Sequence, residues 1–120
     1  MMKIKIEVET EHLIQSRLIL ELSNKLVADV FCAAIPNGGY RRPRDRERLK
    51  REGVRRGSPD LYFVAPNGVS AWLELKTPRG FLSFHQRRFA RMCRRNRHLW
   101  AVAHSVEEAL EIIERWGFLR

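Results

Sequence analysis

The fold is decided by residues 57–76, which read GSPDLYFVAPNGVSAWLELK. A short apolar run, 61–64, follows Pro59, and a second run, 69–76, alternates apolar and polar residues with a period of two. Between them, Pro66, Asn67 and Gly68 have the composition of a hairpin turn. The stretch therefore predicts two antiparallel strands joined by a tight turn.

Polar side chains gather at one end of this hairpin. Side chains two residues apart on a strand face the same side, with Cα atoms about 6.6 Å apart. Glu74 and Lys76 should therefore project together, while Leu73 and Leu75 point into the core. Asp60 opens the preceding strand, so hairpin pairing brings it toward the same end. We expect two carboxylates and an ammonium group to converge there.

These three groups suit the hydrolysis of a phosphodiester. That reaction needs charge neutralisation on the phosphate, an activated water and a stabilised leaving oxygen, which Mg²⁺ held by carboxylates supplies. The main-chain carbonyl of Leu75 offers one more oxygen ligand, and Lys76 would position or deprotonate the water. A structural alternative stays open, because Glu-x-Lys is common as an ion pair and Pro-Asp as a turn.

The composition is that of one soluble globular domain covering residues 1–120, with 44% hydrophobic and 31% charged residues. A net charge of +9, from 23 Lys and Arg against 14 Asp and Glu, indicates a polyanionic partner. With two cysteines, Cys32 and Cys93, and no hydrophobic signal core at the N-terminus, we expect an intracellular, reducing, cytoplasmic location. The histidines and cysteines do not have the spacing of zinc ligands, so we expect no structural zinc site. No apolar run approaches the roughly 20 residues needed to span a membrane, so we expect no membrane insertion.

Outward from the hairpin, apolar residues at spacings of three and four predict amphipathic helices. One begins after Thr10 and extends its apolar spacing to Leu26, and others occupy 83–96 and 105–116, where Ser83 and Ser105 open capping boxes. The helix at 83–96 is expected to bury one stripe and to carry arginines on its opposite side. The stripe consists of Phe89, Met92 and Cys93.

Strand patterns complete the predicted order. Short strands are expected at 30–35 and 99–103, with the strand at 30–35 buried and followed by a turn at 36–39. Residues 4–8 fit either a short strand or a loose terminus. A solvated helix is expected at about 43–52, within the arginine-rich stretch. The sequence thus predicts an α/β fold.

Six short motifs occur in order along nearly the whole chain. They are Glu11-x-x-Ile14-Gln15, Pro36-Asn37-Gly38-Gly39, Leu49-Lys50-x-x-Gly53-Val54, Arg56-Gly57-x-Pro59-Asp60-Leu61, Glu74-Leu75-Lys76 and Leu82-Ser83-x-x-Gln86. In this combination the chain resembles the VRR-NUC branch of the PD-(D/E)xK nuclease superfamily. The resemblance implies a restriction-endonuclease-like domain, with an αβββαβ core and a mixed central sheet flanked by helices.

The resemblance also implies roles for individual residues. Asp60 and Glu74 would bind Mg²⁺ or Mn²⁺, Lys76 would be catalytic, Glu11 would face the site and reach the metal through a water, and Gln86 would line the site. From the residues alone, Glu11 also suits the first turn of a helix, and Gln86 also completes a capping box. A structural interpretation of these two residues therefore stays open.

The basic stretch from residue 40 to residue 56 is expected to hold the DNA backbone. Phosphate contacts orient a partner without reading its sequence, so we expect selection of branched or junction DNA by shape. The resemblance implies a homodimer. Two alternatives remain, a non-catalytic nucleic-acid-binding module and an RNA-directed nuclease, since charge does not separate DNA from RNA. The candidate contacts are Arg41, Arg42, Arg44, Arg48, Lys50, Arg51, Arg55 and Arg56.

Overall fold

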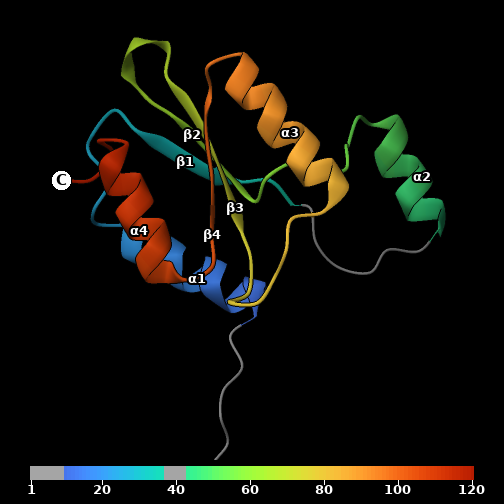
Figure 1. The fold of residues 1–120 in the computed structure, drawn as a ribbon, viewed down its shortest axis with the longest axis horizontal. Coiled ribbons are helices and arrows are strands. Elements are labelled where there is room, and N and C mark those ends of the chain that lie inside the picture. Colours follow the sequence, from blue (N-terminus) through green and yellow to red (C-terminus); the bar gives the residue numbers. More distant parts are fainter. Residues whose placement is uncertain (1–9, 37–42) are drawn as a thin grey trace, which may run out of the picture.

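The predicted hairpin forms the centre of the sheet in the computed structural model, which describes residues 10–36 and 43–120 (Figure 1). Strands β2 (Leu61–Val64) and β3 (Ser70–Leu75) pair antiparallel, with Leu61 opposite Leu73. The turn between them is a short 3₁₀ segment in which Asn67 and Gly68 have φ angles of 65° and 74°. Asn and Gly tolerate this left-handed region best, so the local sequence determines the turn and confirms the predicted hairpin.

Two further strands complete a mixed sheet of order β1-β2-β3-β4. Strand β1 (Phe31–Ala34) runs antiparallel to β2, and β4 (Leu99–Ala103) runs parallel to β3. The parallel pair is joined through helix α3 (Phe84–Arg95), as a parallel connection requires a long crossover. The predicted α/β class and mixed sheet are confirmed.

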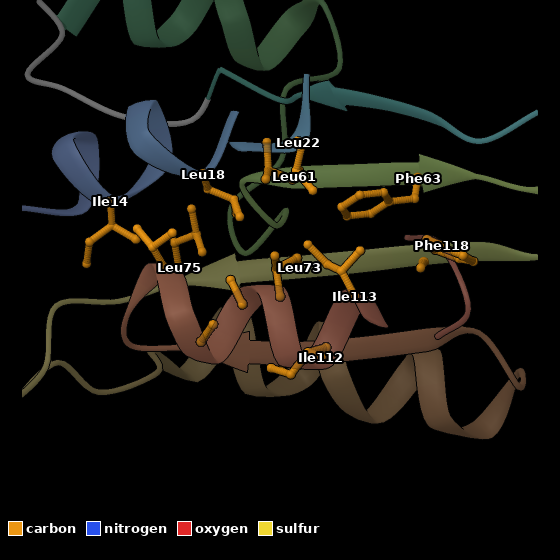
Figure 2. Packing of buried hydrophobic residues seen from close by; sticks show 14 residues of the cluster. Ile14, Leu18, Leu22, Leu61, Phe63, Leu73, Leu75, Ile112, Ile113 and Phe118 are labelled. Carbon is orange, nitrogen blue, oxygen red and sulfur yellow. The ribbon is translucent and has the colours of Figure 1, made fainter. Parts of the chain in front are cut away.

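The hydrophobic core lies between one face of this sheet and two helices, α1 (Glu11–Leu22) and α4 (Val106–Arg115). Leu73 and Leu75 point into it as predicted, and both are fully buried. Figure 2 shows them facing Ile14 and Leu18 from α1 and Ile113 from α4. Both helices begin where expected, because the Thr10 and Ser105 side chains accept the capping hydrogen bonds.

Helix α3 covers the other face of the sheet. The ring of Phe89 packs edge-on against Trp72 at 5.5 Å between centroids, and Ala90 and Cys93 are buried. Met92, predicted to be buried, is 42% exposed. The buried stripe passes through Ala90 instead, because the sheet contacts the side of the helix that carries Phe89, Ala90 and Cys93.

Two other expectations are corrected. Strand β1 was expected to be buried, but it is an edge strand with β2 as its only sheet neighbour in the described chain, and Phe31 is 55% exposed. Helix α1 ends at Leu22, so Leu26 does not extend it but forms a bridge with Leu119. In both cases the apolar residues are as predicted, but their neighbours are not: β1 lies at the edge of the sheet, and Leu26 packs beside Leu119 instead of in a helix.

Helix α2 (Pro43–Arg51) agrees with the solvated helix expected at about 43–52. None of its residues is buried, and Figure 1 shows it set apart from the sheet, on the far side of the start of α3. Residues 4–8, which fit a strand or a loose terminus, and the turn residues 37–39 lie outside the described residues. Among the described helices, none has the length and apolar character of a membrane span.

Candidate active site

The candidate site lies at the end of β3, on the sheet face that α3 covers. Glu74 is 3% exposed and is the buried charged residue of the described chain. Its neighbours in sequence, Leu73 and Leu75, point into the core on the opposite face, so strand alternation directs Glu74 toward α3. Lys76 follows directly after β3, with its main-chain amide bonded to the Ala103 carbonyl at 2.9 Å.

Asp60 reaches this position through the hairpin register. It precedes β2 by one residue, and one of its carboxylate oxygens, Oδ2, accepts a hydrogen bond from the main-chain amide of Leu75 at 2.7 Å. Its own carbonyl accepts a hydrogen bond from the amide of Ile35 at 2.8 Å. Asp60 is therefore fixed between three strands, beside Glu74.

Gln86 and Glu11 approach from two different helices. The Gln86 amide group donates a hydrogen bond to Glu74 Oε1 at 2.8 Å, while its own oxygen accepts one from the Ser83 amide at 2.8 Å. Gln86 thus completes the capping box and also contacts Glu74. Lys76 Nζ lies 3.9 Å from Glu74 Oε1 and 3.9 Å from Glu11 Oε1, which places Glu11 at the rim of the same cluster.

Gly57 contributes to this arrangement through its backbone, a role that was not predicted from the sequence. Its φ angle is +85°, and a Cβ atom there would lie 2.4 Å from the carbonyl oxygen of His85 in the first turn of α3. The segment that leads to Asp60 therefore packs directly on the helix turn that holds Gln86. The signal was present in the sequence as the glycine of the Gly57-x-Pro59-Asp60 motif.

Burial dominates the electrostatics of Glu74. The pKa of the Glu74 carboxyl is raised from 4.5 to about 9, mainly by burial and also by the Asp60 charge, a hydrogen bond to Asp60 and the Glu11 charge. The Lys76 ammonium acts in the opposite direction. A buried carboxyl beside a second carboxylate is a site that a bound cation would stabilise.

The donor set fits a magnesium-type ion. Among the described residues, no three His, Cys, Asp or Glu side chains are placed together to hold a metal. Mg²⁺ keeps several waters and is usually held by one or two carboxylates together with substrate phosphates. Asp60 and Glu74 provide such a pair, and Glu11, 3.9 Å from Lys76, suits an outer position.

Comparison with known proteins identifies the family of the chain. The model of the VRR-NUC domain family matches residues 9–107. The chain belongs to the VRR-NUC family. A solved structure described as a VRR_NUC domain protein superposes with a TM-score of 0.75 at 18% identity, covering 92% of this chain and 89% of that one. No curated protein matched the sequence.

Membership of this family, which is generally of nuclease type, confirms the resemblance and the fold. The match begins just before Glu11 and includes every residue of the cluster. At 18% identity the solved structure supports the fold alone. The roles of the individual side chains in this VRR-NUC domain therefore rest on the geometry described above.

The proposed DNA-contacting arginines occupy a separate part of the domain. Arg44, Arg48, Lys50 and Arg51 are exposed on α2, and Arg55 and Arg56 are exposed in the segment that returns to Asp60. Arg41 and Arg42 lie outside the described residues. The described basic residues are exposed to solvent, and Figure 1 shows α2 set apart from the sheet, whose strand β3 carries Glu74.

The raised pKa of Glu74 predicts a pH-dependent stability of the metal-free VRR-NUC domain. Between pH 4.5 and about 9 the folded state keeps a proton on Glu74 that the unfolded state releases. The contribution of Glu74 to the free energy of unfolding is therefore complete below pH 4.5 and is lost as the pH rises to about 9. We expect the free energy of unfolding to fall by about 1.4 kcal/mol per pH unit within this window. Urea unfolding in EDTA at several pH values measures the slope.

The control for this measurement is Glu74→Gln, which keeps the shape of the side chain but has no proton to lose. Its unfolding free energy should depend less on pH by the same amount. An equal pH dependence in both proteins would mean that Glu74 titrates normally.

Proposed function

We propose that this VRR-NUC domain is a metal-dependent endonuclease that hydrolyses DNA phosphodiester bonds. The observation that carries the proposal is Glu74, a buried carboxyl held by Gln86 at 2.8 Å, beside Asp60 and within 3.9 Å of the Lys76 ammonium. The single Lys76 ammonium does not balance two neighbouring carboxylates, and a structural ion pair does not require the second carboxylate. The arrangement favours a catalytic interpretation over a structural one.

In this proposal Asp60, Glu74 and the Leu75 carbonyl hold Mg²⁺ or Mn²⁺, with Glu11 acting through a water. The ion, when bound, neutralises charge on the phosphate and lowers the pKa of a water. Gln86 fixes the Glu74 carboxylate through its hydrogen bond, and the Asp60 carboxylate is oriented by the Leu75 amide. Lys76, whose side chain is 12% exposed, would supply a positive charge within the cluster, position the attacking water and offset phosphate charge.

We further propose that the substrate is selected by its structure. The net charge of +9 supports a polyanionic partner, and the exposed arginines of 44–56 suit contacts with phosphates, which carry no sequence information. A homodimer would place two sites on two strands of a junction. Sedimentation that finds only monomer, with and without junction DNA, would contradict the dimer.

The test of the proposed activity is a cleavage assay on labelled linear, flapped and four-way-junction DNA and on RNA, with Mg²⁺, Mn²⁺ or EDTA. We expect cleavage of branched DNA with either metal and none in EDTA. Binding without cleavage under every metal condition would favour a non-catalytic binding module. Preferential cleavage of RNA would favour the RNA-directed alternative.

A further inference from the structure

Helix α3 carries a second basic surface that the proposed site does not use. Its 12 residues, FHQRRFARMCRR, include five arginines and no acidic residue. Four side chains recur at spacings of four, three and four along the exposed side, namely Phe84, Arg88, Arg91 and Arg95. Residues at these spacings share one helix face, so α3 presents one stripe of positive charge that its own residues cannot neutralise.

The stripe borders a groove of about 570 Å³, lined by Phe84, Arg88, Arg91, Arg94 and Arg95. It starts in the first turn of the helix, two residues before the Gln86 that contacts Glu74. From Phe84 to Arg95 it extends roughly 16 Å at about 1.5 Å per residue. A stripe of this length can contact several consecutive phosphates of one strand.

Two exposed aromatic side chains lie at and just before the start of α3, three residues apart in sequence. Phe81, in the segment between Lys76 and α3, is 89% exposed, and Phe84 is 57% exposed. Phe84 itself lines the groove, and large apolar side chains exposed beside a polar surface mark a surface that binds a partner. Aromatic side chains next to arginines suit the binding of a single strand, because an aromatic ring stacks on an unpaired base of any sequence.

We propose that α3 binds one DNA strand containing unpaired nucleotides, with Arg88, Arg91 and Arg95 on successive phosphates and Phe81 and Phe84 against unstacked bases beside the cleaved bond. This inference rests on the proposed nuclease function and specifies its substrate, a strand that leaves a duplex at a fork or flap. The strand then runs along α3 away from Glu74, on the sheet face opposite α1 and α4.

The phosphate contacts are tested by fluorescence anisotropy in EDTA, with labelled single-stranded, forked and blunt duplex DNA. We expect Arg88→Gln with Arg91→Gln to weaken forked DNA binding about tenfold and to lower the slope of log Kd against log salt by about 1.4 to 1.8. The matched control is Lys25→Gln with Arg115→Gln, which removes the same charge from exposed residues following α1 and ending α4. Equal losses in both pairs, or no loss in the first, would overturn the proposal.

The stacking contacts are tested in the same assay with Phe81→Ala. Forked and single-stranded DNA should bind about tenfold more weakly, and blunt duplex should bind unchanged. Leu20→Ala removes a similarly exposed apolar side chain, 73% exposed on α1, and should change none of the three affinities. An equal effect of Phe81→Ala on all three DNAs, no effect on any, or tighter binding of a matching RNA would reject the assignment.

Because the readout is binding without metal, it is independent of turnover. A protein that binds forked DNA through α3 but never cleaves it would support this inference and contradict the proposed function. A protein that cleaves DNA, and whose affinity is unchanged by the α3 substitutions, would support the proposed function and contradict this inference.

Discussion

Glu74→Gln is expected to lower the rate of metal-dependent DNA cleavage at least about 10³-fold without unfolding the protein. Glutamine keeps the shape of the side chain and an oxygen that accepts the hydrogen bond now made by Gln86 at 2.8 Å. It cannot carry the negative charge that a bound cation needs, and such an ion contributes several kcal/mol to the transition state. Single-turnover cleavage of junction DNA with saturating Mg²⁺ measures the loss.

Stability measurements separate a catalytic role from a structural one. The metal-free variant should unfold at the same or higher urea concentration than the parent, because the parent buries a carboxyl whose ionisation is unfavourable. Added Mg²⁺ should stabilise the parent and not the variant. Glu111→Gln, an exposed position in the middle of α4, serves as the matched control and should change neither cleavage nor metal response.

Lys76→Met should lose cleavage to a similar degree while keeping stabilisation by Mg²⁺. The Lys76 ammonium lies 3.9 Å from Glu74 and from Glu11, so the change removes a positive charge and leaves the carboxylates in place. Retained cleavage in both the Glu74 and the Lys76 variants would mean that the reaction takes place elsewhere in the domain.

The sequence predicted well those parts of the fold and of the candidate site that depend on local geometry. Strand alternation alone places Glu74 and Lys76 together, and the turn at 66–68 sets the register that brings Asp60 to them. The capping boxes at Ser83 and Ser105 defined where two helices begin. Each of these features follows from residues at most about 16 positions apart, whose spacing is restricted by backbone geometry.

Features that depend on how distant elements pack were not predictable in this way. Glu11 and Lys76 are 65 positions apart, and only the packing of α1 against the sheet brings them within 3.9 Å. Ala90 rather than Met92 faces the sheet because the orientation of α3 is set by the ring contact between Phe89 and Trp72. Phe31 is exposed because β1 is an edge strand of the sheet and α3 lies over the β3–β4 side.

The contact between Gly57 and His85 belongs to this second class and leads to a further prediction. Gly57→Ala is expected to destabilise the folded protein by about 3 kcal/mol or more and to abolish cleavage. An alanine at a positive φ angle costs roughly 1–2 kcal/mol, and overpacking a close contact costs about 1–3 kcal/mol more. Here the new Cβ would lie 2.4 Å from backbone oxygen, which cannot rotate aside as a flexible side chain could.

Two glycines of the same chain provide the control. Gly53 and Gly68 also have positive φ angles, +95° and +74°, but a Cβ atom at either would meet nothing within 4 Å. Gly53→Ala and Gly68→Ala should therefore show the backbone strain alone, about 1–2 kcal/mol, with cleavage retained. Urea unfolding of the three variants measures the difference.

The expected loss of activity in Gly57→Ala follows from what the contact connects. On one side, the chain continues for three residues to Asp60, and on the other, the first turn of α3 continues to Gln86. Separating these two segments moves one carboxylate away from Leu75 and weakens the hydrogen bond that fixes Glu74. If Gly57→Ala matched the two control glycines in stability and still cleaved DNA, the close packing of this loop on α3 would not be what holds the two carboxylates together.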